Sequence, residues 1–187
     1  MLVEYLNQKQ TTKFMRFPNR VTQIGQAINA YLTNATELDD HVVHLLFSAN
    51  RWEAAEELKS YLSNGFNVVV DRYSYSGAAF SAAKPGLTLA WCMQPEYGLP
   101  KPDAVIYLDL PIEQAMARAE FGEERYEKQS FQENVRENFF TIMKSQSPPW
   151  RVLDASKSIK QLHHEVKEIA EECIETAKNN AIGVLGQ

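Results

Sequence analysis

The sequence predicts an α/β protein in which a parallel β-sheet is flanked by helices. Short apolar runs alternate along the chain with longer segments of helical periodicity, the order that favours parallel strands joined by helices. One run, residues 66–70, is rich in β-branched and aromatic residues without polar alternation, which is typical of a strand buried on both faces. The opposite charges of Asp71 and Arg72 follow at once and mark the expected end of this strand.

Strands are expected over residues 11–17, 66–70, 104–110 and 150–153, and helices over residues 1–6, 21–32, 41–62, 76–83, 88–94, 131–143 and 159–178, with a further helix after Pro111. Asp39 or Asp40 can cap the helix that begins at residue 41, and Ser63-Asn64-Gly65 ends it. Pro111 suits a first helical position, where no N–H is needed. The bond before Pro18 requires an extended or turned backbone, with the cis isomer open.

The length of 187 residues predicts one domain, spanning residues 1–187, with room for a substantial core. The net charge of −5 argues against nucleic-acid and acidic-membrane partners, although it leaves room for a local basic pocket. Cys92 and Cys173 show no paired spacing, and no apolar run approaches the length of a membrane span. We therefore expect a cytoplasmic protein, with nuclear or mitochondrial pools open.

Charged side chains gather where the expected strands end. They include Arg20, the pair Asp71 and Arg72, Asp109, and residues 154–157. In open α/β sheets ligands bind beyond the carboxyl ends of the strands, and arginine is suited to gripping a phosphate. A neighbouring aspartate can orient the arginine or hold a metal ion through water. The alternative is a set of ordinary strand-end salt bridges, which contribute little to stability.

A second candidate element lies on the helix predicted over residues 41–62. Phe47 and Arg51 are four residues apart and share one helix face. An aromatic ring one turn from a guanidinium forms a platform on which a flat heterocycle can stack while its edge is hydrogen-bonded. The alternative is a core phenylalanine with an arginine that reaches past it to solvent. His41 and His44 also share a face, but no third metal ligand lies near them in the sequence, which favours a structural role.

Several motifs together closely resemble thymidylate kinase of the eukaryotic type. The stretches that carry the resemblance are Arg16-Phe17-Pro18-Asn19-Arg20, residues 47–52, Asp71-Arg72-Tyr73 with Ser76-Gly77, Gly98-Leu99-Pro100-Lys101-Pro102-Asp103, residues 121–127 and Asp154-Ala155-Ser156-Lys157-Ser158. They occur in the order and spacing of the family and cover nearly the whole chain. The resemblance implies transfer of the γ-phosphoryl group of Mg·ATP to dTMP, giving dTDP in dTTP synthesis. It also implies a homodimer.

The resemblance assigns most of the site residues to dTMP. Phe47 would stack on thymine and Arg51 would bond a carbonyl on the base edge, while Arg20 and Arg72 would hold the 5′-phosphate. Ser76, Gly77, Phe80, Tyr126 and Gln132 would complete the substrate site.

The remaining assignments concern catalysis and ATP. Asp71 would orient Arg72 and would hold Mg²⁺ through water, and Arg72, Asp71 and Arg125 form the catalytic set. A lid over residues 118–132 would carry Arg125 across the phosphates. Arg118 would flank adenine together with Ala155, Ser156 and Lys157.

One feature departs from the family pattern. The family begins with a strand, a phosphate-binding loop of the form G-x-x-x-x-G-K-[ST] and a helix, but no such loop occurs in this sequence. We therefore expect a P-loop-kinase-like sheet that lacks its first, central strand. A truncated gene model, a splice form or a fragment would explain this, and the chain alone would be inactive. Two alternatives stay open: a non-catalytic nucleotide-binding or regulatory paralogue, and a deoxynucleoside kinase, which also has an acid–arginine pair after a strand.

Overall fold

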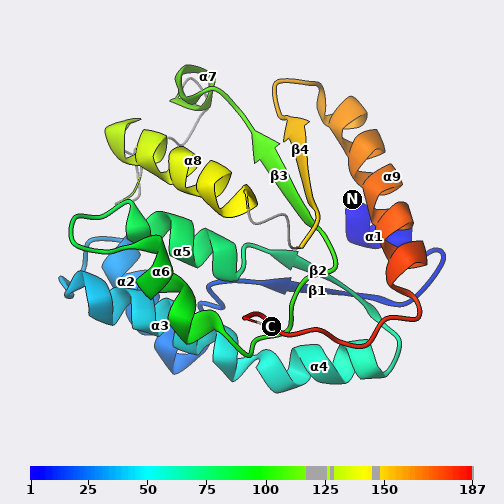
Figure 1. Ribbon diagram of the computed structural model, residues 1–187, viewed down its shortest axis with the longest axis horizontal. Coiled ribbons are helices and arrows are strands. Elements are labelled where there is room, and N and C mark those ends of the chain that lie inside the picture. Colours follow the sequence, from blue (N-terminus) through cyan, green and yellow to red (C-terminus); the bar gives the residue numbers. More distant parts are fainter. Residues whose placement is uncertain (117–125, 127–128, 145–147, 187) are drawn as a thin grey trace.

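The computed structural model describes residues 1–116, 126, 129–144 and 148–186. Four strands lie in this part of the chain: β1 (Thr12–Arg16), β2 (Asn67–Asp71), β3 (Val105–Asp109) and β4 (Trp150–Asp154). β1 pairs with β2 and β3 pairs with β4, both in parallel (Figure 1). The predicted α/β class and the four predicted strands are confirmed.

The described strands form two separate two-stranded sheets, not one continuous sheet. The prediction that residues 66–70 are buried on both faces is wrong, since every residue of β2 is only partly buried. The physical reason is that β2 pairs with β1 along one edge, while no described strand pairs with its other edge. Leu108 on β3 and Val152 on β4 are likewise about half exposed, at 49% and 48%.

Helices account for most of the other described residues. They are α1 (Leu2–Leu6), α2 (Gln23–Leu32), α3 (Asp40–Glu53), α4 (Ala55–Ser63), α5 (Ser74–Ala82), α6 (Leu89–Met93), α7 (Ile112–Met116), α8 (Gln129–Met143) and α9 (Ile159–Ala177), with a 3₁₀ turn, η1, at Gln94–Glu96. The single helix predicted from residue 41 to 62 is in fact two, because the chain tightens at Ala54, whose N–H donates to the Arg51 carbonyl. Asp39 caps α3 by accepting from the N–H of His41 at 2.9 Å.

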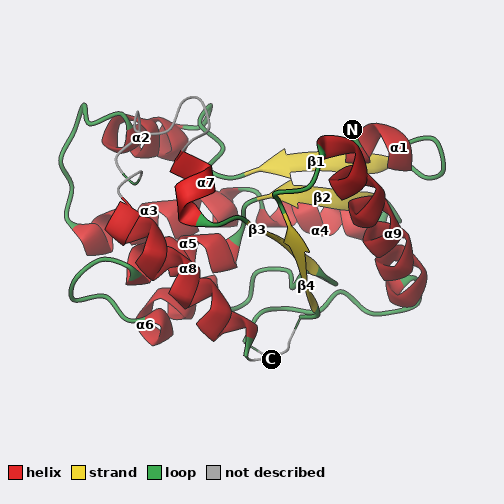
Figure 2. Ribbon diagram, turned by 90° about the horizontal axis from the view of Figure 1, so that it is seen from above, coloured by secondary structure: helices red, strands yellow, loops and turns green. Residues whose placement is uncertain are grey.

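The helices surround the strands unevenly. α1 packs against β1 and α9, and both views place α1 and α9 side by side (Figures 1 and 2). α5 packs against α3, α6 and α8, and this helical group lies toward the carboxyl ends of β1 and β2. The strand ends and the helical group therefore meet around the same space.

No helix among the described residues combines the length and apolarity that a membrane span requires.

The last described residues return to the core. We call residues 183–186 the C-terminal strap. The Gly98 N–H donates to the Leu185 carbonyl at 3.0 Å, and the Leu185 N–H donates to the Leu99 carbonyl at 2.9 Å. These bonds place the buried side chain of Leu185 in a cluster with Ala55, Tyr75 and Leu99. The strap therefore fixes the loop that follows η1.

Candidate functional site

One pocket of about 960 Å³ lies between the carboxyl ends of β1 and β2 and the helices α3 and α5. Many of the side chains predicted for dTMP binding and catalysis line it, from segments far apart in the sequence: Arg20, Phe47, Arg51, Asp71, Arg72, Ser76, Gly77, Phe80, Tyr126 and Gln132. The structure thus brings both predicted elements, the strand-end charges and the Phe47–Arg51 platform, to one site.

None of the residues predicted for ATP is among the described residues that line this pocket. Arg118 and Arg125, with most of the predicted lid, lie outside the described residues. Ala155, Ser156 and Lys157 follow β4 and do not line the pocket. Lys157 pairs with Glu165 at 2.7 Å. These assignments stay predictions.

Asp71 has a different partner from the one expected. Its carboxylate accepts from Nε of Arg16 at 2.7 Å, and Arg72 forms no ion pair with it. β2 ends at Asp71, and the next residue, Arg72, has a φ angle of +62° and has left the strand conformation. Arg16 is the cross-strand neighbour of Asp71 in the parallel register and lies on the same face. The expectation that Asp71 orients Arg72 is therefore corrected: Asp71 holds Arg16.

Arg72 adopts a backbone conformation that is unfavourable for its residue type. Its φ angle is +62°, in the left-handed region, which costs a side chain such as arginine about 1–3 kcal/mol. Its guanidinium carbon lies 5.2 Å from the centroid of the Phe80 ring. Within the described part of the chain no carboxylate pairs with Arg72. Such strain is typical of functional sites, and here it aims a cation into the pocket.

Arg20 is placed by a loop tied to α3. The peptide bond between Phe17 and Pro18 is cis, as the sequence left open. The buried Asn50 side chain on α3 then holds Asn19, accepting from its N–H at 2.7 Å and donating to its carbonyl at 3.2 Å. Nη1 of Arg20 donates to Asn29 at 2.9 Å.

Aromatic rings form one wall of the pocket. The ring of Tyr126 stacks on that of Phe131, with centroids 5.1 Å apart and planes 12° apart, and lies 5.9 Å from that of Phe80. The Gln132 side chain donates to the Tyr126 carbonyl at 2.8 Å. Phe47 also lines the pocket and, like Tyr126, packs against the core cluster between α2 and α3. The pocket therefore offers a flat ligand aromatic surface on which to stack.

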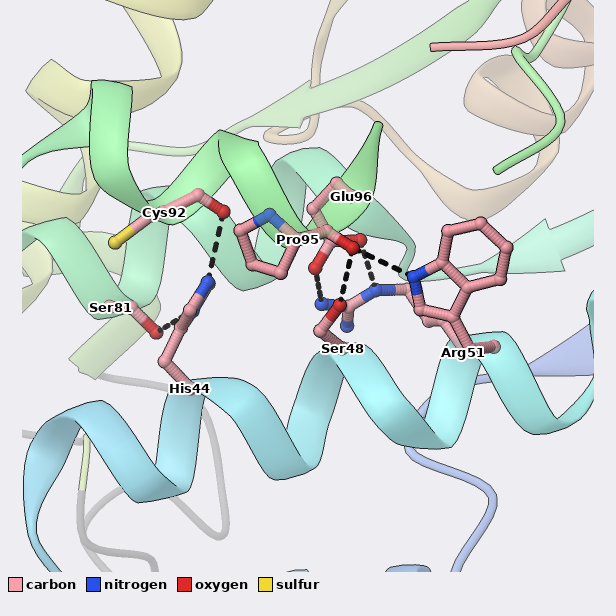
Figure 3. A network of polar contacts seen from close by, with 8 residues as sticks. His44, Ser48, Arg51, Ser81, Cys92, Pro95 and Glu96 are labelled. Carbon is pink, nitrogen blue, oxygen red and sulfur yellow. Dashed lines mark hydrogen bonds and ion pairs between the residues drawn. The ribbon is translucent and has the colours of Figure 1, made fainter. Parts of the chain in front are cut away.

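Arg51 is buried, with 2% of its side chain exposed, and its partner was not predicted. Nε donates to Oε2 of Glu96 at 2.7 Å, and Nη2 donates to Oε1 of the same carboxylate (Figure 3). Glu96 lies in η1, outside the helices and strands that the sequence predicts. A buried arginine requires a counter-charge, but the sequence alone does not show that Arg51 is buried and so gives no signal for this partner.

Comparison with known proteins identifies the family. A family model described as thymidylate kinase matches residues 1–166. The chain belongs to the thymidylate kinase family. The thymidylate kinase of Danio rerio is 46% identical over 98% of this chain and 87% of its own length, and that of Homo sapiens is 46% identical over 92% and 82%. A solved structure of thymidylate kinase from Candida albicans matches with a TM-score of 0.86 at 36% identity, covering 98% of this chain and 90% of that one.

The glycine at position 77 gives room to Arg51 in this thymidylate-kinase-family pocket. A methyl group on Gly77 would lie 2.6 Å from Nη2 of Arg51, which is held by Glu96 and has little freedom to move. We expect Gly77→Ala to lower the free energy of unfolding by about 1–3 kcal/mol and to weaken dTMP binding. Urea unfolding and calorimetry measure the two effects.

Gly183→Ala is the matched control for Gly77→Ala. A methyl group on Gly183 would meet its nearest neighbour, Lys101, at an ordinary 3.5 Å. Its expected effect on stability is within about 0.5 kcal/mol. A Gly77→Ala variant with the stability and dTMP affinity of wild type would contradict the close approach to Arg51.

The buried His44 has a structural role in this family member. Nε2 of His44 lies 2.9 Å from the Cys92 carbonyl, and Nδ1 lies 2.8 Å from Oγ of Ser81 (Figure 3). Since a carbonyl only accepts, Nε2 carries the proton and Nδ1 accepts from the serine hydroxyl. The part of the chain that the structure describes contains no group of three or more potential metal ligands. The two hydrogen bonds of the buried His44 ring connect α3 to α5 and α6.

Burial of His44 makes stability depend on pH. Desolvation lowers the pKa of His44; the charge of Glu96 opposes this effect, and that of Arg51 reinforces it. The unfolded chain therefore takes up the proton first as the pH falls below about 6.5. We expect the free energy of unfolding to decrease with falling pH from that value down to the lowered pKa. Urea unfolding at a series of pH values between about 5 and 7.5 measures it.

His44→Gln tests this assignment. It should unfold more easily than wild type near neutral pH and show a shallower dependence on pH. His41→Gln changes an exposed histidine on the same helix and should keep the wild-type slope. If His44→Gln also kept the wild-type slope, another group would be responsible.

Proposed function

We propose that this protein transfers the γ-phosphoryl group of ATP to the 5′-phosphate of dTMP, forming dTDP for dTTP synthesis. The observation that carries the proposal is the convergence of Arg20, Arg72, Phe47 and Arg51 on one pocket, in a chain of the thymidylate kinase family. Two guanidinium groups suit a phosphate, and an aromatic ring beside a donor suits the edge of a pyrimidine.

The proposed mechanism is one of positioning and charge stabilisation. The attacking oxygen of dTMP is already anionic, so no general base is required. Arg20 and Arg72 hold the acceptor phosphate in line with the donor, and Phe47 fixes the base by stacking. The aromatic wall around Tyr126 excludes water from the nucleoside.

Mg²⁺ is proposed as the partner of ATP. Mg²⁺ is commonly bound through one or two carboxylates together with substrate phosphates and water. Asp71 fits this role, because its partly exposed carboxylate lines the pocket. When bound, the ion would neutralise charge on the phosphates. Arg125 over the phosphates, and Arg118 with residues 155–157 around adenine, complete the proposal.

The nearest alternative reaction is phosphorylation of a nucleoside. A deoxynucleoside kinase needs a base that deprotonates a hydroxyl group, whereas the proposed reaction does not. An ADP-coupled assay that offers dTMP or thymidine as acceptor distinguishes the two activities. We expect ADP release with dTMP only, and release with thymidine alone would overturn the proposal.

A non-catalytic binding role for this chain alone is the second candidate. It is favoured by the absence of a G-x-x-x-x-G-K-[ST] sequence, because that loop supplies the N–H groups and the lysine that hold the ATP phosphates. A sheet that lacks its central strand is proposed for the same reason, and the unpaired edge of β2 among the described strands supports it.

Calorimetry and product analysis on this chain distinguish the two candidates. The proposed kinase predicts that dTMP binds and dTDP forms, whereas the non-catalytic role predicts that dTMP binds while little dTDP forms. Formation of dTDP would overturn the proposed inactivity and leave the dTMP site standing. Failure of dTMP to bind would overturn the site itself.

The assembly and compartment are proposed from the family and the composition. A homodimer is expected, and light scattering should give twice the mass of one chain. A cytoplasmic location, with nuclear or mitochondrial pools open, follows from the unpaired cysteines; imaging of the tagged protein tests it.

A further inference from the structure

The guanidinium of Arg51 separates the carboxylate of Glu96 from the ligand pocket. Both side chains are buried, with 2% and 0% exposed. Arg51 lines the pocket and Glu96 does not. The guanidinium therefore lies between the carboxylate and the space that a ligand would fill.

The contacts with Glu96 fix the direction of the remaining donors. A guanidinium is planar, and its five N–H groups form a rigid fork. Nε and Nη2 are committed to the two oxygens of Glu96, which sets the plane and the angle of the whole group. Within the described part of the chain no hydrogen bond engages Nη1. The lack of a side chain at Gly77, whose position lies against this guanidinium, keeps the adjoining space open.

Glu96 is itself held firmly from two sides. On one side, Ser48 of α3 donates to the carbonyl of Pro95 at 3.0 Å (Figure 3). Trp52 of the same helix donates to this carbonyl at 2.7 Å. On the other side, the Leu99 N–H donates to the Glu96 carbonyl at 3.2 Å, and Leu99 is bonded to the C-terminal strap. The carboxylate thus belongs to a braced segment, and it can set the position of Arg51 rather than follow it.

We propose that Glu96 is a positioning residue that makes this end of the pocket select a pyrimidine with a carbonyl on its 4-position over one with an amino group. The inference rests on the proposed function, in which Arg51 faces the base. Arginine only donates, so fixed N–H groups pair with a carbonyl and oppose the amino group of cytosine. Glu96 also neutralises the guanidinium, which suits an uncharged base edge and leaves the phosphate to Arg20 and Arg72.

Calorimetry with three ligands tests the proposal: dTMP, dCMP and 2-deoxyribose 5-phosphate, which has no base. Glu96→Gln keeps the size of the side chain and removes its charge. We expect it to weaken dTMP binding at least about tenfold and to reduce the preference for dTMP over dCMP by a similar factor. Binding of 2-deoxyribose 5-phosphate should stay within about twofold, because the phosphate contacts are unchanged.

Two further variants serve as controls. Glu96→Asp keeps the charge and should retain the preference for dTMP. Glu56→Gln makes the same chemical change at an exposed glutamate on α4, which pairs with Lys59, and should bind all three ligands as wild type does. An unchanged ratio of dTMP to dCMP affinity in Glu96→Gln would overturn the proposal, as would an equal loss of all three ligands. If the wild-type chain bound no dTMP, the proposed function itself would fall.

A measurement on the wild-type chain covers the case in which Glu96→Gln does not fold. Nitrogen-15 NMR follows the Nε–H signal of Arg51 while dTMP is added. We expect this signal to keep its position, since Nε stays bonded to Glu96, while the Nη1 signals shift. Movement of the Nε–H signal toward the position of a solvent-exposed arginine would show that dTMP breaks the pair and would overturn the proposal.

Discussion

Replacement of Arg72 by alanine is expected to weaken dTMP binding about 100-fold, or by about 3 kcal/mol. Arg72 lines the pocket and pairs with no carboxylate in the described part of the chain, so its charge is available for an anion. The variant would leave a partly buried phosphate without one of its two charged partners. Calorimetry with dTMP measures the loss directly. An unchanged dissociation constant would remove Arg72 from the site.

The backbone at Arg72 provides a sharper form of this experiment. Glycine adopts a φ of +62° without the steric cost that arginine bears. Arg72→Gly should therefore raise the free energy of unfolding, by about 1 kcal/mol, while it weakens dTMP binding as much as alanine does. Arg151→Ala removes an exposed arginine on β4 that pairs with Glu172 and should change neither quantity. If Arg72 only stabilised the fold, both Arg72 variants would have a lower free energy of unfolding than wild type. For the glycine variant we expect the opposite, a higher free energy of unfolding.

The parts of the site that follow from local spacing could be predicted from the sequence. Phe47 and Arg51 are one helical turn apart, and a helix carries such a pair to the same surface whatever surrounds it. Arg20 and Arg72 follow strands that proved parallel, and parallel strands bring their carboxyl ends to one edge. The remaining residues of the substrate site were assigned from the family resemblance.

The parts that depend on contacts between distant segments could not be predicted. Glu96 is one of 24 acidic residues, and no local pattern distinguishes it as the partner of Arg51. The pairing of Asp71 with Arg16 depends on the register between β1 and β2, which the sequence of either strand leaves open. The division of the strands into two sheets has the same origin, because an apolar run indicates a strand but not its neighbours.

Leu99→Ala is the core substitution with the largest expected effect. Leu99 is fully buried and packs with Ala55, Tyr75 and Leu185. Removal of its side chain should leave a cavity and lower the free energy of unfolding by about 2–5 kcal/mol. For a domain of this size the melting temperature would fall by roughly 5–15 °C. Leu45→Ala, at a position on α3 that is 48% exposed, should change stability by less than about 0.5 kcal/mol.

The C-terminal strap makes the effects of Leu99 and Leu185 interdependent. Leu185 packs on Leu99, and the Leu185 N–H donates to the Leu99 carbonyl. Each alanine substitution therefore already weakens the contact between the two side chains, so the second substitution has less of it left to remove. We therefore expect the double variant Leu99→Ala/Leu185→Ala to lose less stability than the sum of the two single variants, by about 0.5–3 kcal/mol. Chemical denaturation of the four proteins of this cycle measures the difference. Strict additivity would show that the strap lies on the core without supporting it.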